Sequence, residues 1–124
     1  MDSKAFHDQL VKKMDEYAHL VYRITKQFPH EELYGIVSQI RRASLSVVLN
    51  YLEGFARGLG QDKVKLNFFK ISYGSLKESK YLLFFSYKEN LLPEIDYNSM
   101  LGLADEIGAM LWTKISSLSN RLNK

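Results

Sequence analysis

The sequence predicts an all-α protein, a single domain over residues 1–124 that folds as an antiparallel up-down-up-down four-helix bundle. Breakers cut the 124 residues at three places, and each segment between them repeats its apolar residues with the period of a helix. None of these segments alternates apolar and polar residues as a half-buried strand does. The connections are short, so consecutive helices should be neighbours that run in opposite directions.

The first helix is expected over residues 3–27 and the second over residues 31–57. Pro29 ends the first, because proline disfavours helix at the residue before it. Gly58-Leu59-Gly60 ends the second, since glycine commonly follows the last helical turn. The apolar stripe of the first helix comprises Phe6, Leu10, Met14, Tyr17, Val21, Ile24 and Phe28. The stripe of the second comprises Ile36, Ile40, Ala43, Val47, Tyr51 and Gly54.

The third helix is expected over residues 62–90 and the fourth over residues 96–122, separated by the break at Asn90–Pro93. Asp62 and Asp96 are expected to cap them, because a carboxylate at a helix start accepts from unpaired backbone N–H groups. The apolar stripe of the fourth helix comprises Met100, Ala104, Ile107, Leu111, Ile115, Leu118 and Leu122.

The third helix carries two apolar stripes, and this feature predicts self-association. The stripe expected to face the core comprises Val64, Phe68, Ile71, Ser75, Glu78, Leu82 and Phe85. A helix in a bundle has one face for its own core, so a second, nearly opposite stripe needs another partner. We therefore predict a homo-oligomer. Its expected interface comprises Leu66, Phe69, Tyr73, Leu76 and Phe84 with Leu52 and Phe55 of the second helix.

A strip of polar side chains borders the apolar stripe of the second helix. Such groups are costly to bury unpaired, so the sequence predicts a structural polar network. Its expected members are Gln39, Arg42, Asn50, Glu53, Ser75 and Glu78, with Ser46 in the same strip. An acid–base set of Asn50, Glu53 and Glu78 is the alternative, but no histidine or nucleophile accompanies it. We predict that the protein is not an enzyme.

Composition excludes several classes of site and of cellular location. The chain has no cysteine, and Glu16 with His19 forms only half of the paired Glu-x-x-His motif of di-iron bundles. We therefore expect no metal and no cofactor. The charged start of the chain lacks the apolar region of a signal peptide, and no apolar run approaches the roughly 20 residues that span a bilayer. A cytoplasmic protein without membrane contact is expected.

The net charge is +3, and the excess of positive charge lies within residues 60–90. There Lys63, Lys70, Lys77 and Lys88 fall along one side of the expected third helix, with Tyr81 almost in line. Lysines in a row beside an aromatic ring can follow a phosphate backbone and stack a base. Arg57 and Lys65 complete the predicted nucleic-acid-binding set. A solvated face that only keeps the helix soluble is the alternative.

The chain also resembles the bacterial 23S rRNA intervening-sequence protein family. The matching residues are Phe28-Pro29 with Glu32, Tyr34 and Gly35; Gln39-Ile40-Arg41-Arg42-Ala43; Ser46 with Asn50; Glu53-Gly54 with Arg57; and Gly74-Ser75 with Glu78. The first and fourth helices match in length and pattern, so the resemblance covers nearly the whole chain. The sequence departs from the family pattern at Val48-Leu49 and at Tyr51-Leu52, where bulkier residues stand.

The resemblance implies an all-helical bundle, a homopentameric ring and no catalysis. Related bundles serve reverse transcriptases as accessory factors, in which a basic pentamer contacts nucleic acid and the polymerase. The leading hypothesis is a non-enzymatic homo-oligomer, pentameric by resemblance, that binds RNA or DNA through its basic surface. A protein-interaction scaffold or accessory factor, which binds another protein and no nucleic acid, is the alternative.

Overall fold

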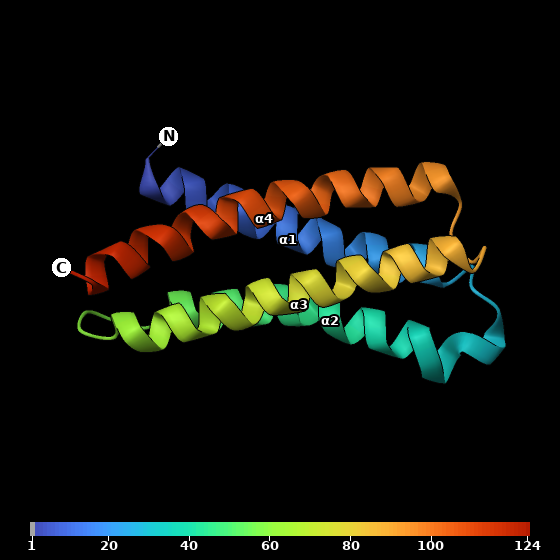
Figure 1. Cartoon of the computed structure of the whole chain (residues 1–124), viewed down its shortest axis with the longest axis horizontal. Coiled ribbons are helices and arrows are strands. Elements are labelled where there is room, and N and C mark those ends of the chain that lie inside the picture. The colour runs from blue at the N-terminus through green and yellow to red at the C-terminus, as the bar shows by residue number, and fades with distance from the viewer. Residues whose placement is uncertain (1) are drawn as a thin grey trace.

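The computed structural model describes residues 2–124 and contains four long helices, with no strand among those residues. They are α1 (Ser3–Thr25), α2 (Ser38–Phe55), α3 (Asp62–Lys88) and α4 (Glu94–Leu122). Each helix packs on the next in sequence, and α4 returns to pack on α1. Figure 1 shows that the two ends of the chain and the α2–α3 connection lie at one end of the bundle. The predicted all-α bundle is confirmed.

The chain bends before α2, where the sequence pattern had predicted continuous helix. A 3₁₀ turn spans His30–Glu32, a wide turn spans Leu33–Val37, and regular helix begins only at Ser38. Gly35 interrupts the helical backbone with φ −108° and ψ −110°. The second helix is therefore shorter than the predicted range 31–57 at both ends.

The aspartates expected to cap α3 and α4 lie inside the first turn of their helices and not at the N-cap position. Asp62 is the first residue of α3, and Asp96 lies in the first turn of α4, which begins after Pro93. Acidic groups in a first turn still complement the positive end of the helix dipole. A true side-chain cap occurs at α1, where Asp2 Oδ1 accepts the Ala5 N–H at 2.7 Å.

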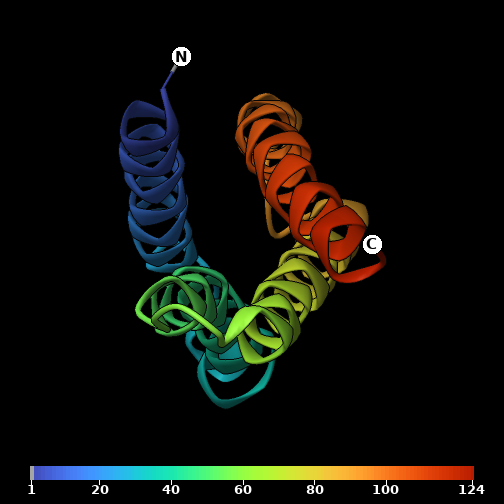
Figure 2. The same cartoon turned by 90° about the vertical axis from the view of Figure 1, so that its left-hand side faces the viewer.

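Figure 2 shows the four helices in a view along the bundle. Buried apolar side chains from all four helices form one core. Most of the stripes predicted for the first, second and fourth helices are buried in it. Their fully buried members include Leu10, Met14, Tyr17, Val21, Ile40, Val47, Tyr51, Ala104, Ile107 and Leu111. Leu122, at the end of the predicted fourth stripe, is exposed instead.

The two faces of α3 are largely the reverse of the prediction. Its buried residues are Leu66, Phe69, Ser72, Leu76, Ser79, Leu82, Leu83 and Ser86. Leu66, Phe69 and Leu76, predicted to contact another subunit, therefore lie in the core of this one. Val64 and Ile71, predicted to face the core, are exposed. The assignment of the two α3 stripes was wrong for these residues, whereas Leu82 is buried as predicted.

Buried serines explain why the core face of α3 looked less apolar than its outer face. Ser72 Oγ donates to the carbonyl of Val47 on α2 at 2.6 Å, so it ties the two helices together. Ser79 Oγ donates to the Leu76 carbonyl at 2.8 Å and lies 2.7 Å from the Tyr17 hydroxyl of α1. These bonds satisfy the buried hydroxyls. Burial raises the pKa of Tyr17 to about 12.

Candidate nucleic-acid interface

The predicted row of lysines forms a free, cationic face on α3. Lys63, Lys70, Lys77 and Lys88 are all exposed. Within residues 2–124, none of the four has a carboxylate at ion-pair distance. By contrast, Lys80 on the same helix pairs with Asp105 at 2.6 Å. We call the four residues the lysine face.

Aromatic side chains lie directly beside the lysine face. The rings of Tyr73 on α3 and Trp112 on α4 have their centroids 5.4 Å apart. Trp112 is 54% exposed, and Lys77 Nζ lies 5.2 Å from the centre of the Tyr73 ring. These three side chains line a groove of about 250 Å³ between α3 and α4. The sequence analysis did not predict a role for Trp112, because no row of basic residues accompanies it on its own helix.

Arg57 and Lys65 do not belong to the lysine face. Arg57 Nη2 pairs with Glu53 Oε1 at 3.1 Å, and its guanidinium lies over the Phe68 ring at 5.0 Å. Lys65 is half-buried and lines a recess with Arg57 beside the α2–α3 connection. The six predicted basic residues therefore divide between the side of α3 and one end of the bundle.

The polar network is smaller than predicted. Ser46 Oγ of α2 and Ser75 Oγ of α3 lie 2.7 Å apart, and Asn50 Nδ2 donates to Ser46 Oγ at 2.8 Å. Glu53 pairs only with Arg57, one turn later on the same helix. Gln39, Arg42 and Glu78 are exposed and have no side-chain hydrogen bond or ion pair with residues 2–124. The Ser46–Ser75 contact joins α2 to α3, Asn50 supports it from within α2, and the larger polar side chains lie at the surface.

An exposed apolar surface flanks that serine contact. Leu49 follows Ser46 by three residues and Ile71 precedes Ser75 by four, so both lie on the same side of their helices as the contact. Leu49 is 60% exposed and Ile71 is 51% exposed. The surface continues along α3, and we call it the α2–α3 seam. Its residues are Leu49, Val64, Phe68, Ile71 and Phe85.

The remaining predicted interface residues are dispersed. Tyr73 is half-buried against Trp112, and Phe84 is exposed beside Tyr81 and Tyr97. Leu52 is exposed on α2, and Phe55 is exposed at its end. They do not form one continuous surface with the buried Leu66, Phe69 and Leu76.

The acidic groups considered for chemistry lie at the surface. Glu53 and Glu78 are exposed. His19 Nε2 lies 3.2 Å from Asp15 Oδ1, and Glu16 is exposed on the same helix. Across residues 2–124, no three histidine, aspartate or glutamate side chains converge as metal ligands. In that same range, every helix lacks the length of apolar sequence that a membrane crossing requires.

The fold and surface define a four-helix-bundle protein with a cationic face on its third helix. The family model described as 23S rRNA-intervening sequence protein matches residues 7–113, which is most of the chain. The chain therefore belongs to this family, and the predicted resemblance is confirmed. Comparison with curated proteins gives no match.

Proposed function

We propose that this protein is a non-enzymatic homo-oligomer that binds nucleic acid, preferentially single-stranded RNA, through the lysine face. The observation that carries the proposal is a row of exposed, unpaired lysines beside an exposed aromatic pair. Lys63, Lys70 and Lys77 repeat every seven residues, which separates them by roughly 10 Å along the helix. Such a row supports repeated phosphate contacts along one strand.

The aromatic pair favours a single strand as the ligand. Tyr73 and Trp112 present rings at the edge of the lysine face, where an unstacked base can lie on Trp112. Stacking on an aromatic side chain contributes about 1–3 kcal/mol per base, and a paired base in a duplex cannot use it. Phosphate contacts from Lys70 and Lys77 would hold the strand over this pair.

Self-association is supported by the α2–α3 seam. This apolar surface lies on a different side of α3 from the lysine face, so covering it with a second subunit leaves the lysines exposed. A closed ring built in this way repeats the lysine face around an axis and strengthens its electrostatic field. The number five comes from the family resemblance and not from the residues.

Replacing Lys63, Lys70 and Lys77 together by glutamine is expected to abolish most of the affinity for single-stranded RNA. On a single strand each lost phosphate contact lowers the slope of log affinity against log salt concentration by about 0.7, so the triple variant should lose about two. Fluorescence anisotropy of a labelled RNA, titrated at several salt concentrations, measures both quantities.

The matched control carries the same charge change on exposed lysines elsewhere, with Lys4, Lys12 and Lys26 replaced by glutamine. It should bind as the unmodified protein does, apart from a small general effect of net charge. If no RNA or DNA binds at about 50 mM salt, the proposal fails and the scaffold hypothesis replaces it. A partner protein that stays bound during purification, even after nuclease treatment, would also support the scaffold hypothesis.

Placing a charge at each side of the seam should dissociate the oligomer. Leu49→Glu with Ile71→Glu puts two carboxylates on the surface proposed to be covered, and a buried unpaired charge is costly. Sedimentation velocity should then show one subunit, while Leu59→Glu, at a fully exposed connection residue, should not change the assembly. An unmodified protein that remains a single subunit at high concentration would contradict self-association.

A further inference from the structure

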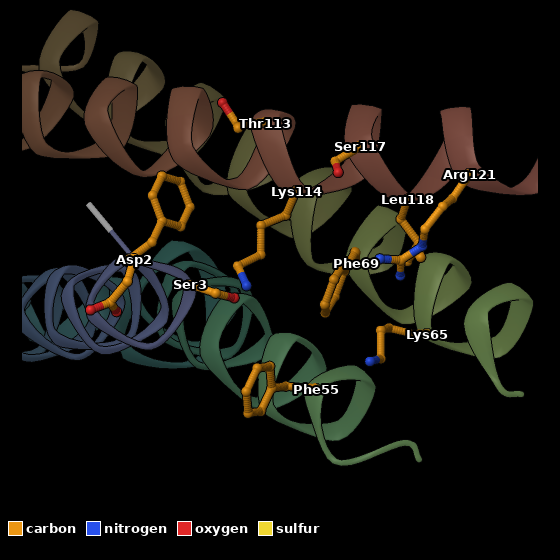
Figure 3. Close-up of a pocket in the computed structure, with 11 residues that line it drawn as sticks. Asp2, Ser3, Phe55, Lys65, Phe69, Thr113, Lys114, Ser117, Leu118 and Arg121 are labelled. Atoms are coloured by element: carbon orange, nitrogen blue, oxygen red, sulfur yellow. The ribbon is translucent and has the colours of Figure 1, made fainter. Parts of the chain in front are cut away.

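A cavity of about 470 Å³ opens at the end of the bundle where both chain ends lie. Side chains from all four helices line it, as Figure 3 shows. Phe6 comes from α1, Phe55 from α2, Lys65 from α3, and Lys114 and Arg121 from α4. Its volume lies within the range of small-molecule sites, roughly 300–1,000 Å³.

The charged groups of this cavity are mainly cations. Lys65, Lys114 and Arg121 line it, and Asp2 is the one carboxylate among its lining residues. The Asp2 carboxylate already accepts the Ala5 N–H, and Arg121 pairs with Asp62 at 3.3 Å. For residues 2–124, no carboxylate lies at ion-pair distance from either Lys65 or Lys114. An excess of positive charge therefore remains inside the cavity.

Lys114 is held in place by aromatic rings. Its Nζ lies 5.4 Å from the ring centre of Phe55, 5.8 Å from that of Phe6 and 5.9 Å from that of Tyr51. Cation–π attraction offsets part of the cost of holding an ammonium there. Burial, followed by the positive charge of Lys65, lowers the pKa of Lys114. A bound anion between the two lysines would relieve that repulsion.

The rings also give the cavity an apolar side suited to a planar group. Phe55 is 43% exposed, and it is fixed by stacking on His7 with ring centres 3.6 Å apart. Phe6 lines the cavity from α1. Thr113 and Ser117 line its α4 side, and the Thr113 hydroxyl donates to the Ala109 carbonyl at 3.0 Å. Cations, rigid rings and a serine hydroxyl in one recess match the phosphate, base and sugar of a nucleotide.

We propose that this cavity is a nucleotide-binding site for one nucleoside 5′-phosphate unit. Lys65 and Lys114 hold the phosphate, Arg121 closes its outer side, and the base lies against Phe6 and Phe55. The ligand is either a free nucleotide or the 5′-phosphorylated end of an RNA chain, because both present the same chemistry. The site is separate from the lysine face and goes beyond the proposed function, since binding of a free nucleotide does not require RNA binding.

The test is calorimetric titration of the full chain with AMP, and with adenosine and inorganic phosphate as partial ligands. AMP should bind, and adenosine or phosphate alone should bind at least tenfold more weakly. Lys65→Gln and Lys114→Gln should each weaken AMP binding about tenfold, the loss expected for one charge-assisted hydrogen bond. Lys12→Gln, on the exposed side of α1, should leave it unchanged.

Two further measurements separate a folding defect from a loss of binding and identify the source of the ligand. If Lys114→Gln lowers the thermal unfolding temperature, Lys65→Gln and Phe55→Leu carry the test instead, because Phe55 is 43% exposed and the cation–π contacts with the rings are made by Lys114. A short RNA with a 5′-phosphate that competes with AMP, while its 5′-hydroxyl form does not, identifies the chain end as a source. AMP binding without such competition identifies the free nucleotide.

The outcomes separate this proposal from the one for the lysine face. The Lys63, Lys70 and Lys77 triple variant should retain AMP binding, and Lys65→Gln should retain binding of 5′-hydroxyl RNA. Phosphate that binds as tightly as AMP would overturn the nucleotide assignment and leave a simple anion site. No binding of AMP or of phosphorylated RNA at millimolar concentration would overturn the site altogether.

Discussion

Gly54→Val is expected to destabilise the bundle by about 3 kcal/mol, because α2 and α3 leave no room for a side chain at this position. A Cβ atom at residue 54 would lie 2.8 Å from Phe68 Cβ and 3.0 Å from the Phe69 ring. Phe68 Cβ is fixed to the α3 backbone, so relief requires the two helices to separate. Overpacking of this kind typically costs 1–3 kcal/mol, and β-branching adds crowding within the helix.

The measurement is urea-induced unfolding followed by circular dichroism, at one fixed protein concentration because an assembled protein unfolds in a concentration-dependent way. Gly74→Ala on α3 is the matched control, since within residues 2–124 no atom of another helix lies within 4 Å of its added Cβ. Alanine there should stabilise the helix by up to about 1 kcal/mol. Equal effects of the two substitutions would show that helix propensity, and not the close approach, decides the cost at residue 54.

The number and order of the helices could be predicted because the residues that break them act locally in the sequence. α1 ends at Thr25 shortly before Pro29, α2 at Phe55 shortly before Gly58, and α3 at Lys88 shortly before Pro93. Proline and glycine disfavour a continuing helix through backbone properties of the residue itself. The bend at Gly35 could not be predicted in the same way. A single glycine is compatible with a continuing helix, and only the packing of the preceding turn on the bundle decides between the two.

The faces of α3 could not be assigned because both carry large apolar residues. Ser72, Ser79 and Ser86 make the buried face look polar, although their hydroxyls bond to backbone carbonyls and cost little there. Periodicity identifies stripes but does not say which stripe its own bundle covers.

The candidate sites also differ in how far the sequence could predict them. The lysine face follows from helical spacing within one helix, so its exposed row could be predicted from the sequence. The Tyr73–Trp112 pair and the cavity around Lys114 each combine residues from different helices. No spacing in the sequence connects Lys65 with Lys114, because their proximity depends on the register of α3 against α4.

Tyr51→Ala is expected to cost about 3–5 kcal/mol, which is the range for deleting a large aromatic core side chain. Tyr51 is fully buried, and its ring centre lies 5.0 Å from that of Phe69 on α3. Its hydroxyl lies 2.8 Å from His7 Nδ1 on α1. Lys114 of α4 lies near the same ring, so one side chain contacts the other three helices at this end of the bundle.

Tyr51→Phe separates the ring from the hydroxyl. It keeps the stacking and removes only the bond to His7, so it should cost about 1 kcal/mol in the same urea unfolding measurement. Tyr81→Ala, at an exposed tyrosine of α3, should change stability by no more than about 0.5 kcal/mol. A loss below 1 kcal/mol for Tyr51→Ala would mean that this end of the bundle is held by other contacts. The expected large loss would show that the Tyr51 ring is a packing centre of this end of the bundle and also supports the rings around Lys114.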